Sequence, residues 1–370
     1  MKKPNIRIAI QLSTCACFFL FIYIYAIGNL FVKDRTFSEQ ENRMLAQKPE
    51  TSFKNIFSGD FDEQFESWFQ DQFIHRDSWV RTNASIMKSA GHMQNNGIYF
   101  GRKGYLIQQH LQYDDKISTN NLSAIQEFKE ECGAAIHLLI VPDACFGEKK
   151  YLPLGAYNID EKAFIDNLQQ LAEGIDFINI TKEIGAEDNY FRTDHHWNEK
   201  GAHIAYEAIA RNVLKKTPVD FTFEEVSNNF YGTMYSSSGA FWTKPDSLYK
   251  IIPARPNPVT VTYEDGKKSN SLYVDENLNQ KDQYTYYLDG NHSHVHIDTM
   301  VNTEKKALVI EDSFGHILAP FLSQEYVSLD FIDLRYYHES VLPLIDQNTD
   351  VYIICSLESF AEDASLSAIW

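Results

Sequence analysis

A long apolar stretch occupies the beginning of the chain. Between Arg7 and Lys33 lie 25 consecutive residues without a charge, and about 20 apolar residues are enough for a helix to cross a bilayer. A cleaved signal peptide would have a shorter apolar region followed by a small-residue cleavage site, whereas here the apolar sequence continues through Leu30, Phe31 and Val32. The pattern therefore predicts an uncleaved transmembrane helix within residues 1–32.

A second pattern, aromatic and helical, follows a polar connector. Aromatic residues stand at i, i+4, i+7, i+8 and i+12 over residues 61–73, a spacing that places them on one face of a helix. The opposite face is acidic and would be repelled by anionic lipid. We therefore expect this helix to pack against its own domain, within a connector and helical extension that spans residues 33–96.

From Gly97 onward, short apolar segments alternate with helical ones. Several are continuous apolar runs, as expected for strands whose sheet is covered by helices on both faces. The alternation predicts an α/β domain with a mainly parallel sheet over residues 97–370, interrupted by a polar, proline-bearing insertion at about 216–300. The expected strands are residues 97–100, 104–108, 135–142, 176–180, 307–311, 326–332 and 350–355, and the expected helices lie near 160–173, 199–214 and 314–324.

The charge of the chain argues against nucleic acid as a partner and predicts how the chain is oriented in the membrane. The 370 residues carry a formal net charge of −18, which lacks the positive field that a nucleic-acid backbone demands. The first 35 residues hold five basic side chains and one acidic one, whereas the remainder has 28 basic and 50 acidic side chains, or −22. Because basic residues precede the apolar stretch, the positive-inside rule predicts a cytoplasmic N-terminus and an extracytoplasmic body.

One candidate for chemistry is the loop before the helix expected from Glu199. In an extended segment residues i and i+2 share a side, so Asp194 and His196 can face together while His195 points away. A carboxylate beside an imidazole fixes its tautomer and supports the imidazolium, which a general base for a hydroxyl nucleophile needs. A solvent-exposed or purely structural pair of histidines is the alternative.

The second candidate is Ser313, which directly follows the strand expected at 307–311. A helix expected to begin at this serine would direct its first N–H groups to the same spot as the serine amide. That arrangement supplies a nucleophile and part of an oxyanion hole, although a serine after a strand is ordinarily a helix N-cap. The two motifs together favour an acyl-transfer site, because the serine at the strand end would supply the nucleophile and the Asp-X-His motif would supply the general base with its orienting carboxylate.

An acyl-transfer site also needs groups that stabilise the oxyanion and bind the substrate. An oxyanion hole needs a second donor, which Asn291 or Arg335 could supply, with a turn and a surface ion pair as the alternatives. His195 and Trp197 are assigned to packing or to sugar contact, with core burial of Trp197 opposed to stacking on a sugar.

A metal site is the rival interpretation of the same loop. Asp194, His195, His196 and His203 are all ligand types, but residues 195 and 196 point apart and no regular zinc spacing is present. We therefore expect neither a metal nor another cofactor at this site.

Two segments carry a resemblance to a known family. Thr193-Asp-His-His-Trp197 and Val309-Ile-Glu-Asp-Ser313-Phe resemble the signatures of the DHHW protein family, which is similar to SGNH-hydrolase-like proteins that O-acetylate alginate and related exopolysaccharides. The resemblance covers nearly the whole chain after the apolar stretch. Its further segments are Phe37–Arg43, Asp71–Phe73, Tyr231–Thr233, Leu288–Asn291 and Asp333–Tyr337.

The resemblance implies an SGNH-type, three-layer α/β/α domain in which the aspartate and histidine precede the serine. By that resemblance Ser313 is the nucleophile, His196 the base and Asp194 its orienting carboxylate. The chain departs from the family of GDS-type sequences at Glu311, where those sequences have glycine, so the backbone there is less able to approach a substrate.

The expected function is that of a single-pass, membrane-anchored O-acetyltransferase or acetylesterase acting outside the cytoplasm on an exopolysaccharide or cell-wall glycan. Its partners would be the polysaccharide acceptor and, as the resemblance implies, a multi-spanning membrane acyltransferase that supplies acetyl groups. The alternative is a non-catalytic glycan-binding or assembly protein of the same machinery. The two differ in whether Ser313, His196 and Asp194 converge within hydrogen-bonding distance.

Overall fold

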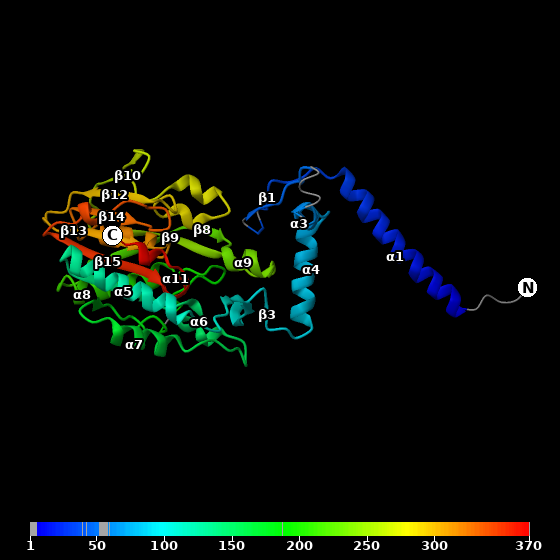
Figure 1. The fold of residues 1–370 in the computed structure, drawn as a ribbon, viewed down its shortest axis with the longest axis horizontal. Helices are drawn as coiled ribbons and strands as arrows, with labels where there is room; N and C mark the ends of the chain where they lie inside the picture. Colours follow the sequence, from blue (N-terminus) through cyan, green and yellow to red (C-terminus); the bar gives the residue numbers. More distant parts are fainter. Residues whose placement is uncertain are drawn as a thin grey trace, which may run out of the picture. The chain divides into compact units, whose positions relative to one another are not determined.

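The computed structural model (Figure 1) describes residues 6–38, 40–41, 43–51, 58, 60–186 and 188–369. The chain forms two compact units, Met1–Ile86 and Met87–Trp370. The predicted cytoplasmic tip before Ile6 lies outside the described residues.

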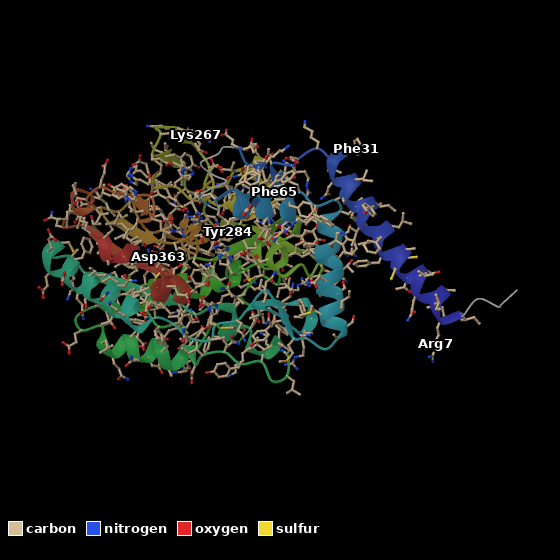
Figure 2. All side chains as sticks on the ribbon, turned by 45° about the vertical axis from the view of Figure 1, so that its right-hand side comes forward. Arg7, Phe31, Phe65, Lys267, Tyr284 and Asp363 are labelled. Carbon is tan, nitrogen blue, oxygen red and sulfur yellow. The ribbon has the colours of Figure 1, made fainter. Side chains whose placement is uncertain are left out.

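The first unit begins with helix α1 (Ile6–Phe31), which is long and apolar enough to span a membrane. Its side chains project outward along the helix from Arg7 to Phe31 (Figure 2), and most of them are exposed. The other elements of this unit are the antiparallel pair β1 (Phe37–Ser38) and β2 (Arg43–Met44), and the helices α3 (Asp60–Asp71) and α4 (Arg76–Ser89).

Helix α3 carries the aromatic face that the spacing predicts. The Phe65 ring contacts those of Phe61 and Phe69, with centroids 5.9 and 6.3 Å apart. Phe65 and Phe69 nevertheless remain 44% and 40% exposed, so the expectation of a packed core helix is wrong for these two side chains. Rings four residues apart lie against one another along a helix, and these pairs are stacked, so each ring covers part of its neighbour while much of both side chains stays exposed.

The second unit is built around an eight-stranded sheet with the strand order β11-β10-β12-β14-β13-β15-β6-β7. Strands β14, β13, β15, β6 and β7 are parallel, and β12, β10 and β11 extend them in antiparallel fashion. This confirms the predicted α/β fold with a mainly parallel sheet. The bounds are β6 (Ile136–Val141), β7 (Asp176–Phe177), β10 (Val259–Tyr263), β11 (Lys268–Ser269), β12 (His294–Thr299), β13 (Lys306–Glu311), β14 (Ser328–Ile332) and β15 (Thr349–Ser356).

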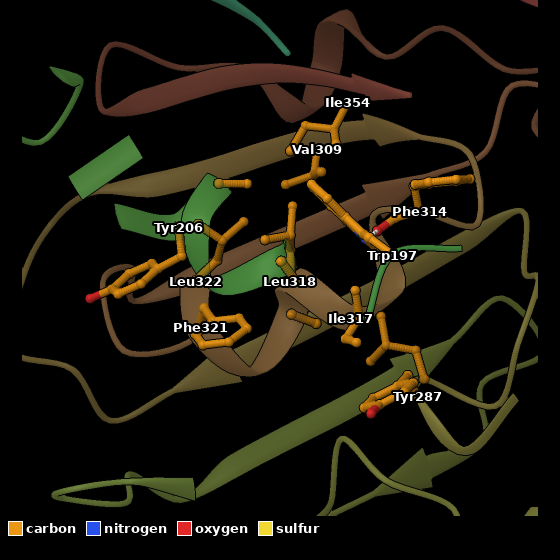
Figure 3. Packing of buried hydrophobic residues seen from close by; sticks show 14 of the residues in the cluster. Trp197, Tyr206, Tyr287, Val309, Phe314, Ile317, Leu318, Phe321, Leu322 and Ile354 are labelled. Atoms are coloured by element: carbon orange, nitrogen blue, oxygen red, sulfur yellow. Dashed lines mark hydrogen bonds between the residues drawn. The ribbon is translucent and has the colours of Figure 1, made fainter. Parts of the chain in front are cut away.

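Helices cover both faces of this sheet, because its central strands alternate between two hydrophobic clusters. Leu308 and Ile310 of β13 pack with α5 (Asp115–Cys132), α7 (Glu161–Leu171) and α11 (Leu357–Glu362). Ala307 and Val309 pack on the other face with α8 (Glu199–Asn212), α10 (Ala319–Leu322) and the hairpin of β8 (Phe221–Phe230) and β9 (Asp246–Pro253). Figure 3 shows the second cluster around Val309, Trp197 and Phe321. The result is the three-layer arrangement that the resemblance implies.

The remaining elements of the second unit are short. They are the antiparallel sheet β3 (Gln94–Asn95), β4 (Ile98–Phe100) and β5 (Leu106–Gln108), and the helices α6 (Ala144–Gly147) and α9 (Thr233–Ser238). Strands β10, β11 and β12 all lie within the region predicted as an insertion, and they join the main sheet.

The helix expected at 314–324 is not continuous. A 3₁₀ turn at His316–Leu318 precedes the four-residue α10, and Ser313 itself lies in a turn before both. The prediction that a helix begins at Ser313 is therefore wrong. Pro320 lies in the first turn of α10, where its missing N–H is tolerated, whereas it would interrupt the hydrogen bonding of a longer helix.

Candidate active site

Ser313 lies at the carboxyl edge of the central parallel strand β13, in a turn that Asp312 holds in place. Oδ1 of Asp312 accepts a hydrogen bond from the Phe314 amide at 2.9 Å. Oδ2 accepts two more, from the amide and the hydroxyl of Ser356, both at 3.0 Å. Ser356 ends the neighbouring strand β15, so one carboxylate ties the serine turn to the adjacent strand and leaves Ser313 half-buried and accessible.

The loop with the two histidines is fixed against this turn. The indole Nε1 of Trp197 donates to the carbonyl of Phe314 at 2.9 Å, and Tyr190 and Trp197 form an antiparallel bridge that closes the loop. Trp197 is fully buried. A sugar cannot reach it, so the suggested sugar contact is wrong and core packing is its role.

The side chains of His196, Asp194 and Ser313 lie within hydrogen-bonding distance of one another in series. His196 Nε2 lies 2.7 Å from Ser313 Oγ, and His196 Nδ1 lies 2.6 Å from Asp194 Oδ1. Asp194 and His196 are buried. An imidazole held between a carboxylate and a serine hydroxyl in this order can remove the serine proton while its other nitrogen stays protonated.

Asp194 is fixed by hydrogen bonds from a separate segment of the chain. Its Oδ2 accepts from the amide of Thr233 at 2.8 Å and from its hydroxyl at 3.1 Å. A side chain at Gly232 would collide with the same carboxylate, which explains why glycine precedes Thr233. The Tyr231-Gly-Thr233 segment thus packs against Asp194 and holds its carboxylate in place, a role that its residue types alone did not indicate.

Electrostatics set the protonation states that general base catalysis needs. Burial alone would raise the pKa of Asp194, but the neighbouring His195 and His196 and the hydrogen bonds from His196 lower it well below its usual range. Burial and the adjacent His195 lower the pKa of His196 to about 4, against the opposing effect of Asp194. At neutral pH the aspartate is therefore ionised and His196 is neutral, so His196 can accept a proton.

Tyr284 is a member of the site that the sequence did not identify. Its ring stacks on that of His196, with centroids 3.8 Å apart and planes 7° from parallel, and its hydroxyl donates to the Ser313 carbonyl at 3.0 Å. One buried side chain therefore contacts both the base and the nucleophile segment. No motif surrounds Tyr284, so only the three-dimensional arrangement reveals it.

The other predicted site residues are placed differently. His195 Nδ1 lies 2.8 Å from Thr233 Oγ1, and its partly exposed ring lies 3.8 Å from that of His196. The expectation that His195 points away is therefore wrong, because the loop is bent and brings one ligand atom each of Asp194, His195 and His196 within 4.8 Å of one another. Arg335 is committed to Asp333, with Nε 2.9 Å from Oδ1, and this partner raises the pKa of Arg335. Asn291 is exposed after a turn. Within the described part of the chain, neither Arg335 nor Asn291 contacts Ser313.

The Ser313 amide itself has no hydrogen-bond acceptor among the residues that the structure describes. It is therefore able to serve as one oxyanion donor, as expected from its position. The structure does not bring Asn291 or Arg335 to the serine as a second donor.

Glu311, the departure from glycine, is buried beside the serine turn. A side chain at Gly315 would collide with its carboxyl group, so Glu311 occupies the space above that glycine. Burial and the nearby Asp333 and Asp312 raise the pKa of Glu311 well above its usual range. The same burial therefore disfavours a negative charge on Glu311 beside the nucleophile.

A family model matches the chain in the region of both sequence motifs. Residues 174–332 match the family model described as DHHW protein, and this range contains Asp194, His196 and Ser313. The match confirms the resemblance that the two motifs indicate. No curated protein matches the chain.

Several solved structures share the fold. A DHHW family protein from Eubacterium siraeum is 24% identical with a TM-score of 0.65, and the alignment covers 74% of this chain and 95% of that one. Bacillus cereus PatB1 with a sulfonyl adduct is 20% identical with a TM-score of 0.59, covering 74% and 100% of the two chains. The O-acetyltransferase domain of Pseudomonas putida AlgJ is 16% identical, with a TM-score of 0.47 and coverages of 74% and 95%. At these identities the first two likenesses show a common fold.

Proposed function

We propose that this protein is a membrane-anchored serine acyltransferase or esterase that acts on O-acetyl groups of an exopolysaccharide or cell-wall glycan. The observation that carries the proposal is the 2.7 Å distance between His196 Nε2 and Ser313 Oγ, with Asp194 on the opposite side of the imidazole. The family match and its resemblance to glycan O-acetylating proteins support the acetyl group and the glycan. A non-catalytic glycan-binding protein would have no need of this convergence.

The geometry suggests a two-step reaction. Ser313 Oγ attacks the acetyl carbonyl of a donor while His196 Nε2 takes the hydroxyl proton, and the Ser313 amide faces the developing oxyanion. The C–O bond of the donor breaks, His196 returns the proton to the leaving oxygen, and the acetyl group remains as an ester on Ser313. A sugar hydroxyl, or water, then gives its proton to His196 and attacks this ester. The bond between the acetyl carbon and Ser313 Oγ breaks, and His196 returns the proton to Ser313 Oγ, which restores the free serine.

The experiment uses the full-length protein in detergent micelles with 4-nitrophenyl acetate as the donor. We expect nitrophenol release and, with oligosaccharides present, acetylated sugar that mass spectrometry detects. Acetate without acetylated sugar would favour the esterase. Binding of the oligosaccharides without release of nitrophenol would reject the enzyme in favour of the glycan-binding alternative.

The same proposal places the second unit outside the cytoplasm. Helix α1 would be a single-pass anchor with the basic residues before it in the cytoplasm, and a multi-spanning membrane acyltransferase would supply acetyl groups across the bilayer. Protease added to intact spheroplasts should digest the second unit. If the second unit survives until the membrane is dissolved, the proposed orientation is wrong.

The lowered pKa of His196 leads to a prediction about pH. Because the imidazole is protonated only below about pH 4, kcat/KM for ester hydrolysis should stay level through mildly acidic pH and decline near pH 4. A histidine with the ordinary pKa of 6.5 would instead lose activity near that pH. The measurement is a profile of kcat/KM against pH.

His195 provides the control for this profile. Its charge helps to lower the pKa of His196, so His195→Gln should move the decline to higher pH. A wild-type midpoint at or above that of free histidine would contradict the assigned environment of His196.

The stacking of Tyr284 on His196 leads to a second prediction. Tyr284→Leu removes the flat contact that orients the imidazole, and misplacing a catalytic group by about 1 Å costs roughly 100-fold in rate. We expect kcat to fall by about that factor, with KM little changed. Tyr284→Phe retains the ring and should restore most of the rate, whereas equal losses in both variants would show that the hydroxyl, and not the stacking, matters.

A further inference from the structure

A cluster of two histidines and one aspartate lies outside the candidate active site, on the antiparallel part of the main sheet. His294 and His296 belong to β12 and are two residues apart, so their side chains share one face of the strand. Asp330 of the adjacent strand β14 is the direct register partner of His296. The alternating residues Val295 and Ile297 face the hydrophobic core, which directs the two imidazoles to the opposite face.

The side-chain atoms of this cluster point toward one another. His294 Nε2 and His296 Nδ1 each lie 2.7 Å from the same oxygen, Oδ1 of Asp330. One ligand atom from each of the three residues lies within 4.8 Å of the others. The side chains of His294 and His296 are 26% and 35% exposed and that of Asp330 is 14% exposed, so the cluster is held by the sheet yet open to ions from solution.

A fourth residue completes a pattern that is common at metal centres. The other ring nitrogen of His296, Nε2, lies 3.2 Å from Oδ1 of Asp298. A histidine that binds a metal through one nitrogen usually donates its other N–H to a carboxylate, which fixes its tautomer and orientation. Asp298 therefore holds His296 with Nδ1 directed at Asp330, where the metal would lie.

We propose that His294, His296 and Asp330 bind a divalent transition-metal ion of the Zn²⁺ class. Two imidazole nitrogens and one carboxylate oxygen suit zinc, whereas calcium and magnesium prefer oxygen ligands alone. Ligand atoms about 2.0–2.2 Å from a tetrahedral zinc lie roughly 3.3 Å apart. Small side-chain rotations that open the 2.7 Å contacts would therefore admit the ion.

The proposed ion would connect two parts of the sheet. Strand β12 begins the antiparallel extension and β14 is the outermost parallel strand beside it, so ligands from both strands would tie the extension to the parallel half. Three protein ligands leave a fourth position for water. This inference rests on β12 and β14 alone and is independent of the proposed acyl chemistry.

The test uses full-length protein in detergent micelles, treated with a chelator and then titrated with zinc chloride. Calorimetry should show one ion bound through these ligands, and thermal unfolding should shift to higher temperature because the ion binds the folded state. His294→Gln and His296→Gln should each remove the binding and the shift. Asp298→Asn should weaken the affinity by about 10- to 100-fold, as expected for a carboxylate that orients a ligand.

His292→Gln is the matched control. His292 lies two residues before β12 and pairs with a single carboxylate, Glu264, with Nδ1 2.8 Å from its Oε2, so losing it should leave zinc binding unchanged. Ester hydrolysis, or circular dichroism, shows that each variant is folded. Absence of binding in the wild type, binding that persists in both His294→Gln and His296→Gln, or binding removed instead by His195→Gln or His110→Gln would overturn the proposal.

Discussion

Replacing Ser313 with alanine should abolish acetyl-ester hydrolysis, with kcat/KM falling by about 10³-fold or more. The hydroxyl that forms the acyl ester is then missing, and His196 has no serine proton to accept. The side chain of Ser313 is half-buried and its hydroxyl contacts only His196 among the described residues, so the fold should be unaffected. Initial rates with 4-nitrophenyl acetate, at matched circular dichroism, measure the effect.

A second reagent separates loss of the nucleophile from loss of binding. A sulfonyl fluoride should add covalently to Ser313 in the wild type and not to Ser313→Ala, as mass spectrometry of the labelled peptide would show. Ser340→Ala, a change of the same kind at an exposed loop position, should retain full activity. Hydrolysis by Ser313→Ala at the wild-type rate would remove Ser313 from the mechanism.

Asp194→Asn should be nearly as damaging, with a loss of about 10⁴-fold in kcat at neutral pH. Thr233 donates two hydrogen bonds to Oδ2 of Asp194, so the oxygen of an asparagine would turn toward Thr233. Its NH₂ group would then donate to Nδ1 of His196, which forces the imidazole proton onto Nε2. A protonated Nε2 facing Ser313 cannot act as a base.

Asp188→Asn is the control for this change. Asp188 precedes the same loop, and its carboxylate pairs with Lys150 and Tyr151 instead of with His196, so its replacement should cost little activity. Initial rates of ester hydrolysis are compared for the two variants across pH. A loss of less than about tenfold in Asp194→Asn would show that the carboxylate does not set the tautomer.

The sequence indicated the central residues of the site because the strand before Ser313 and the Asp194-X-His196 motif can both be recognised from short stretches of sequence. Continuous apolar runs became the central strands β6, β13 and β15, and the end of a parallel strand is where a following serine must lie. Asp194 and His196 do meet, but the loop is bent and not extended, and His195 lies against both of them. The strands follow from backbone periodicity, so a single sequence is enough to infer them, whereas the shape of this loop is not inferred in the same way.

Features that depend on packing between distant segments could not be inferred in this way. Tyr284 reaches His196 only because the 3₁₀ turn Gln283–Tyr286 folds over the loop. A tryptophan at position 197 is equally typical of a sugar-stacking surface and of a core, and only its complete burial decides between them. The carboxyl of Glu311 takes the space next to Gly315, which no pattern of residue types predicts.

The bond between Trp197 and Phe314 also determines when activity can first appear. It joins positions 117 residues apart. During synthesis the loop that carries His196 is therefore made first, strands β8, β9, β10, β11 and β12 follow, and the turn that carries Ser313 is made only after them. A chain that stops short of Ser313 carries the base without a nucleophile. Under the proposed function, ester hydrolysis would therefore report on a completely synthesised and folded second unit.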